Sequence, residues 1–108
     1  MTRASCITVI DHNRKISSSY LDAIPKVLAD ELEPEGIRVS TIAPGLIQTE
    51  RTGWIWKNET KLRKRSDKQA LKRLGTPEDV VAAAVYLAAA ARSFVTGALW
   101  LVDGGVVW

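Results

Sequence analysis

The sequence predicts an α/β fold in which a parallel sheet of about three strands is flanked by helices. Along the 108 residues, strand-like and helix-like segments alternate in the order strand, helix, strand, helices, strand. This alternation favours parallel strands joined by right-handed crossovers. The length, with 46% hydrophobic and 25% charged residues, is typical of a single globular domain. We therefore expect one domain over residues 1–108 that holds part of a doubly wound sheet.

The first two elements follow from short-range patterns. A β-branched run predicts a strand over about 6–10. Apolar residues at three- and four-residue spacing then predict a helix over about 20–33. Pro25 would cost about 3 kcal/mol in a helix interior, so this helix either begins late, with Asp22 as its N-cap, or is kinked. A proline and a glycine just beyond residue 33 end it.

The middle of the chain holds a second strand and a long connection. Residues 37–42 are nearly all apolar, as in a strand that is covered on both faces. A Pro-Gly pair then opens a loop over 43–72 at the carboxyl end of that strand, where open α/β sheets bind their ligands. Within this loop, residues 54–71 have a partly amphipathic pattern that predicts a helix, and Gly75 ends it.

The last helix has the clearest start. The tetrapeptide from Thr76 to Asp79 places an N-cap hydroxyl, a proline and two carboxylates in the positive first turn. It predicts a helix over 77–91, whose many apolar residues indicate that it is buried. A third strand is expected over 98–102.

Composition excludes several kinds of site. The single Cys6 rules out an internal disulfide, and with His12 as the only histidine we expect no metal site of ordinary ligand spacing. No apolar run approaches the roughly 20 residues of a membrane span, and no signal-peptide core follows the N-terminus. These features predict a cytoplasmic protein that does not enter membranes.

Four segments stand in a specific order along the chain. They are Ala29–Ser40, Ile42–Thr49, Arg73–Val80, and Val95–Gly97 followed by Leu101–Gly105. In this order and spacing they resemble the C-terminal half of the short-chain dehydrogenase/reductase family, over roughly Ser19 to Gly105. The resemblance implies a truncated, Rossmann-like domain of an oxidoreductase.

The resemblance assigns the loop after the second strand to the nicotinamide end of NAD or NADP. By resemblance, Pro44 and Gly45 would let the backbone approach the ring, because glycine has no Cβ. The backbone of Ile47 and the hydroxyl of Thr49 would contact the carboxamide or a nearby phosphate. Without the resemblance, the Pro-Gly pair is equally well explained as a plain turn.

The family's catalytic Tyr–Lys pair has no counterpart in the sequence. Family spacing, counted back from residues 37–39, places the Tyr at Arg14 and the Lys at Ser18. Tyr20 is followed four positions later by Ile24, so it does not restore the motif. We therefore assign no catalytic residue.

The glycine-rich phosphate turn is also missing. Neither G-x-x-x-G-x-G nor G-x-G-x-x-G occurs, although a dinucleotide's pyrophosphate needs backbone N–H groups at a helix N-terminus. We therefore expect weak or no binding of NAD or NADP by this chain alone, and no activity from it alone.

Two tryptophans and a basic tract lie where the family has a substrate-covering segment. Trp54 and Trp56 either shape an apolar substrate pocket or anchor a short helix. Basic residues over 57–73 would suit nucleic-acid phosphates, but Glu59 and Asp67 dilute the tract. A solvated helix face is the preferred interpretation, and nucleic-acid binding is the third choice among functions.

Two functions from different classes lead. The first is an NAD(P)-dependent oxidoreductase acting on a carbonyl or an alcohol. The second is a non-catalytic remnant that forms a homo-oligomer or pairs with another chain, because a half-sheet leaves an unpaired edge that recruits partners. The family resemblance also implies a subunit interface at the 77–91 helix and the last strand, near Trp100 and Trp108.

Overall fold

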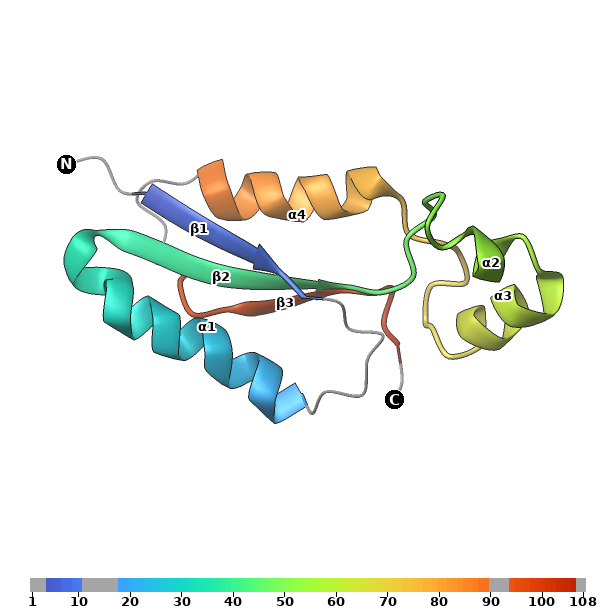
Figure 1. Ribbon diagram of the computed structural model, residues 1–108, viewed down its shortest axis with the longest axis horizontal. Helices are drawn as coiled ribbons and strands as arrows, with labels where there is room; N and C mark the ends of the chain where they lie inside the picture. Colours follow the sequence, from blue (N-terminus) through green and yellow to red (C-terminus); the bar gives the residue numbers. More distant parts are fainter. Residues whose placement is uncertain (1–3, 11–17, 90–93, 107–108) are drawn as a thin grey trace.

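The computed structural model has the predicted α/β architecture (Figure 1). The structure describes residues 4–10, 18–89 and 94–106. Within these ranges, three parallel strands form one sheet in the order β1-β2-β3. The strands are β1 (Ala4–Val9), β2 (Ile37–Pro44) and β3 (Leu99–Val102).

The helices lie on both faces of the sheet (Figure 1). Helix α1 (Ser18–Leu32) packs against β2 and β3, and α4 (Pro77–Ala89) contacts all three strands from the other face. Because the strand order follows the chain order while the two helices lie on opposite faces, the two crossovers have opposite hands. The expectation of right-handed crossovers is therefore wrong for one of them. The long connection between β2 and α4 allows the chain to reach the other face.

Strand β2 is the centre of the sheet and is buried along most of its length. All its residues from Arg38 to Ala43 are buried, as predicted for a strand covered on both faces. In register, Thr41 lies opposite Thr8 of β1 and opposite Leu99 of β3. The hydroxyls of Thr8 and Thr41 are 2.6 Å apart, so this buried polar group has a partner.

Helix α1 does not begin late. It starts at Ser18, so the predicted N-cap at Asp22 is wrong and Pro25 lies inside the helix. Proline donates no backbone hydrogen bond there, but Pro25 is fully buried, which indicates that its packing outweighs the lost bond. A 3-10 helix, η1 (Glu33–Glu35), follows and ends at Gly36, which has a left-handed φ of 72°.

The predicted single helix over 54–71 is wrong. Two short helices take its place, α2 (Gly53–Trp56) and α3 (Glu59–Ser66). The side chain of Asn58 accepts a hydrogen bond from the backbone N–H of Lys61 at 3.1 Å, so it caps α3 and interrupts the helical path. An asparagine before a polar helical run is a start signal, and the partly amphipathic pattern concealed it.

Helix α4 begins as predicted but is more exposed than predicted. The Asp79 carboxylate accepts from the N–H of Thr76 at 2.8 Å, and the Asp79 N–H donates to the Thr76 hydroxyl at 3.4 Å. This reciprocal pairing is a capping box. Among the described α4 residues only Leu87 is buried, while Val81 and Val85 are 56% and 57% exposed. A buried α4 is therefore wrong for this chain, because nothing within the described residues covers its outer side.

The molecule is elongated, with extents of 51 × 26 × 23 Å. Its radius of gyration is 15.4 Å, against about 13 Å for a compact domain of this length. Helices α2 and α3 project beyond the carboxyl ends of the strands and account for much of this length (Figure 1). In the part of the chain that the structure describes, no helix is both long and apolar enough to cross a membrane.

Candidate functional site

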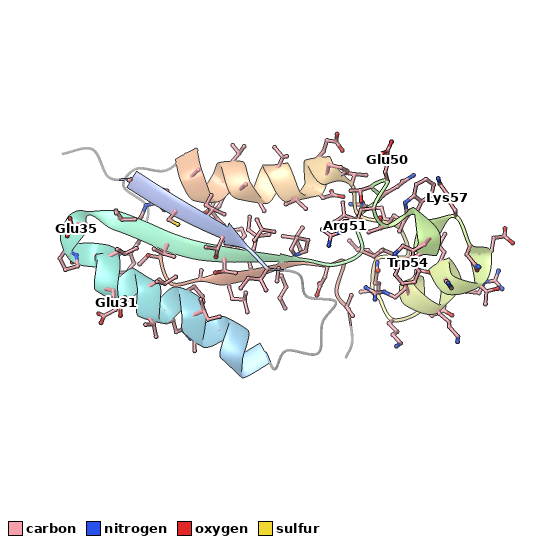
Figure 2. All side chains as sticks on the ribbon, in the orientation of Figure 1. Glu31, Glu35, Glu50, Arg51, Trp54 and Lys57 are labelled. Carbon is pink, nitrogen blue, oxygen red and sulfur yellow. The ribbon has the colours of Figure 1, made fainter. Side chains whose placement is uncertain are left out.

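The loop that leaves β2 lies at the carboxyl edge of the sheet. Figure 2 shows Glu50, Arg51, Trp54 and Lys57 gathered at this end of the molecule, with Glu35 at the opposite end. Ligands of open α/β sheets bind outside the carboxyl ends of the strands. The loop is therefore placed where the sequence predicts a site.

Gly45 is required by the packing of the sheet itself. A Cβ at this position would lie 2.8 Å from the Cα of Asp103, closer than carbon atoms approach without overlap. The N–H of Gly45 donates to the Val102 carbonyl at 2.9 Å, and Pro44 pairs with Val102 in register. The family resemblance implies a different role for Pro44 and Gly45, which is to let the backbone approach a nicotinamide ring. That contact stays a prediction.

Ile47 is held to a second glycine by a short parallel bridge. The N–H of Gln48 donates to the Gly75 carbonyl at 2.8 Å, and the N–H of Gly75 donates to the Leu46 carbonyl at 3.1 Å. In a parallel pairing of this kind the N–H and carbonyl of the middle residue point to the other side. The backbone polar groups of Ile47 therefore face away from Gly75. Among the described residues, the Ile47 N–H has no hydrogen-bond partner.

The hydroxyl of Thr52 contacts several residues of the loop, and no sequence pattern predicts this role. Its Oγ1 lies 2.6 Å from the Ile47 carbonyl oxygen and accepts from the backbone N–H of Thr49 at 3.1 Å. The two threonine hydroxyls are 3.3 Å apart. The structure thus brings Ile47 and Thr49, two of the predicted contacts, together around one side chain. The available signal was a threonine three residues beyond Thr49, a spacing at which hydroxyls bond nearby backbone.

The two predicted substrate tryptophans behave differently. The indole N–H of Trp56 donates to the Thr49 carbonyl at 2.8 Å, so this side chain anchors the loop. Trp54 is 66% exposed, and the ammonium of Lys61 lies 5.0 Å from its ring centroid. The two side chains thus differ in their contacts, and a role for either in binding a substrate stays a prediction.

A cavity of about 270 Å³ lies between this loop and the end of β3. Its lining includes two buried polar side chains, Gln69 and Asp103. The Gln69 amide donates to the carbonyls of Leu71 and Arg73 at 3.0 and 3.1 Å, and the Asp103 carboxylate accepts from the N–H of Gly105 at 3.0 Å. Both side chains therefore fix backbone turns. The sequence does not predict the role of Gln69, because a single glutamine in a basic tract matches no motif.

An ion pair closes the turn between Gly75 and α4. The guanidinium of Arg73 reaches the carboxylate of Asp79 at 2.9 and 3.1 Å. This hydrogen bond, together with the one from the Thr76 backbone, holds the pKa of the Asp79 carboxyl well below its usual range. The same pairing raises the pKa of Arg73. The Arg73 side chain is 57% exposed, so we interpret the pair as a support for the turn.

The positions that family spacing gives to the catalytic pair, Arg14 and Ser18, precede or begin α1. Arg14 lies outside the described residues, as does Trp108. Ser18 is the first residue of α1, and Tyr20 lies in its first turn. Within the described ranges, no three His, Cys, Asp or Glu side chains cluster as metal ligands would.

Comparison with known proteins gives a consistent result. A family model described as enoyl-(acyl carrier protein) reductase matches residues 11–107. The human dehydrogenase/reductase SDR family member 4 is 36% identical over 90 residues, which are 83% of this chain and 32% of that protein. The chain thus spans about a third of the length of this relative.

Solved structures resemble nearly the whole chain. An Agrobacterium tumefaciens protein with bound NADP superposes with a TM-score of 0.81 and 27% identity, covering 94% of this chain and 46% of that chain. A 4-hydroxyisoleucine dehydrogenase mutant complexed with NADH and succinate gives 0.82 and 27%, covering 95% and 46%. With a family model matched over most of its length and a parallel α/β sheet of the same form, the chain belongs to the short-chain dehydrogenase/reductase family.

Proposed function

We propose that this chain supplies the nicotinamide-facing loop of an NAD(P)-dependent oxidoreductase that acts on a carbonyl or an alcohol. The observation that carries the proposal is the backbone N–H of Ile47, which is turned away from Gly75 and has no partner among the described residues. A primary carboxamide needs both a donor and an acceptor. Ile47 offers the donor, and the neighbouring Thr49 hydroxyl offers the acceptor.

Relatives support the cofactor class. Family members with similar folds have been solved with NADP and with NADH, and a nicotinamide cofactor supplies hydride transfer when bound. In this chain, Ile47 and Thr49 would hold the carboxamide. Gly45, which has no Cβ, would let the backbone lie close to the ring. The choice between NAD and NADP is made at the adenosine end, for which these residues provide no contact.

The chain by itself is proposed to be inactive. Its sequence has no glycine-rich phosphate turn, and Arg14 and Ser18 stand at the positions of the family's Tyr and Lys. Without a positioned group of suitable pKa, a carbonyl oxygen receives no proton as hydride arrives. Turnover would therefore require a proton donor and a phosphate-binding turn from another polypeptide segment.

Titration with reduced nicotinamide mononucleotide tests the loop, because this probe lacks the adenosine half. Two-dimensional NMR of the isotope-labelled chain should show shifts of the Ile47 amide, with a dissociation constant near 1 mM, the range of about −4 kcal/mol of binding free energy. Adenosine monophosphate at equal concentration is the control and should leave that amide unchanged. If the Ile47 amide does not respond to the nicotinamide probe, the proposed function is wrong.

A non-catalytic association role is the second candidate, and exposed apolar side chains favour it. On and near the outer side of α4, Val81, Val85 and Tyr86 are each more than half exposed, and Tyr86 packs against Trp100 with ring centroids 5.2 Å apart. Exposed apolar side chains that gather on one helix are typical of interaction sites. This role is compatible with the first, since a partner could bury α4 and complete the active site.

A further inference from the structure

We propose that Thr52 is a positioning residue for the nicotinamide-facing loop: its hydroxyl sets both the loop conformation and the hydrogen-bonding polarity that Ile47 and Thr49 present to a carboxamide. The inference rests on the proposed function, since it concerns how that loop meets its ligand. The geometry that carries it is the set of short contacts around the Thr52 Oγ1.

The position of Thr52 in the chain makes its side-chain direction informative. Thr52 is the residue immediately before α2, where a threonine hydroxyl commonly caps the first turn. Here the side chain makes no capping hydrogen bond to α2. It reaches back to the Ile47 carbonyl, five residues earlier, at 2.6 Å. The hydroxyl therefore stabilises the loop instead of the helix that follows it.

The hydrogen of the Thr52 hydroxyl has one best acceptor. A hydroxyl has a single hydrogen and two lone pairs, and the 2.6 Å contact to the Ile47 carbonyl is shorter than the 3.2 Å contact to the Thr49 carbonyl. Because the carbonyl of Ile47 can only accept, Thr52 donates to it. The lone pairs of Thr52 then accept from the Thr49 backbone N–H at 3.1 Å and from the Thr49 hydroxyl at 3.3 Å.

This arrangement fixes what Thr49 can offer to a ligand. With its hydrogen directed to Thr52, the Thr49 hydroxyl has its lone pairs available as acceptors. The Ile47 N–H remains a donor. Donor and acceptor then match the two ends of a primary carboxamide, and the match depends on Thr52 as the common partner.

Trp56 supports the same loop independently. Its indole N–H donates to the Thr49 carbonyl at 2.8 Å, so the loop has a second attachment that does not involve the Thr52 hydroxyl. Loss of that hydroxyl is therefore expected to loosen and reorient the loop while the fold persists. This makes Thr52→Val, which keeps the shape of the side chain and removes the hydroxyl, an interpretable variant.

The test compares Thr52→Val, Thr52→Ser and the control Thr60→Val, which makes the same change on the exposed surface of α3. The first readout is hydrogen exchange of the Thr49 amide. We expect exchange about fivefold faster in Thr52→Val, as for loss of a hydrogen bond worth about 1 kcal/mol, and near the original rate in Thr52→Ser and Thr60→Val.

The second readout is the shift of the Ile47 amide with reduced nicotinamide mononucleotide. We expect the response to weaken several-fold in Thr52→Val and to be retained in Thr52→Ser. If the original chain and Thr52→Val respond equally, the positioning role is wrong while the proposed function stands. If the Ile47 amide of the original chain does not respond at all, the proposed function fails. A change in Thr49 exchange would then show only that Thr52 stabilises the loop, and the positioning role would also be wrong.

Discussion

Two glycines near the loop differ in whether the surrounding packing leaves room for a side chain. At Gly45 an added Cβ would lie 2.8 Å from the Cα of Asp103, which is backbone and cannot rotate away. At Gly53 it would meet only the flexible side chain of Lys57, at 3.4 Å. The Pro-Gly motif predicts the importance of Gly45, but the neighbour that enforces it is Asp103, just after β3 and more than fifty residues later.

Gly45→Ala is therefore expected to destabilise the protein by roughly 1–3 kcal/mol, the usual cost of overpacking. Gly53→Ala is the control, and at the start of α2 it should be neutral or stabilise by up to about 1 kcal/mol, because alanine is the better helix former. Urea unfolding followed by tryptophan fluorescence measures both. Equal midpoints for the two variants would contradict the assignment of Gly45 to packing.

The ion pair at the start of α4 predicts a pH dependence. The pKa of Asp79 is lowered in the folded protein, first by the hydrogen bond from Arg73 and then by the Thr76 backbone. A lowered folded pKa gives stability that is fully present above the unfolded value of about 3.9 and is lost as pH falls further. Asp79→Asn should lower thermal stability at neutral pH, and the difference from the original chain should shrink below about pH 4. Asp67→Asn is the control, since Asp67 is exposed and immediately follows α3. A stability difference between Asp79→Asn and the original chain that stays constant with pH would exclude the ion pair as its origin.

At the scale of elements, local signals predicted boundaries well where the capping chemistry was explicit. The Thr76–Asp79 box begins α4, and the apolar run of β2 is buried on both faces. The segment between them is predicted less well, because the partly amphipathic pattern over 54–71 indicates one helix, whereas the Asn58 cap divides it. The role of Thr52 was not predictable, since its hydroxyl turns away from the helix that its position would lead it to cap.

The division between α2 and α3 should depend on the Asn58 cap. Asn58→Ala removes the acceptor for the Lys61 N–H and should cost about 0.5–2 kcal/mol. Asn58→Asp keeps an acceptor and should retain that stability. Hydrogen exchange of the first-turn amides of α3 measures the effect locally. If exchange in Asn58→Ala matches that of the original chain, another contact holds the division between the two helices.

At the scale of the whole molecule, the prediction of a parallel sheet is confirmed, and the prediction that both crossovers are right-handed is wrong. Right-handed crossovers are a strong rule for each strand–helix–strand unit, but the unit between β2 and β3 contains the long 45–76 connection with two extra helices. No local pattern states on which face such a connection returns. The face of α4 also decides what stays exposed, which the apolar composition of α4 alone could not reveal.

Association through α4 is the prediction that belongs to this scale. Val81, Val85 and Tyr86 on α4 are each more than half exposed, and we expect a partner that covers them to stabilise the chain. We expect sedimentation equilibrium to show a homo-oligomer that weakens with Val85→Lys, because a lysine on an apolar interface must be desolvated. Val27→Lys is the matched control, since Val27 on α1 is 55% exposed against 57% for Val85. A well-folded monomer at all concentrations would contradict self-association, and equal weakening by both variants would show that the interface is not confined to α4.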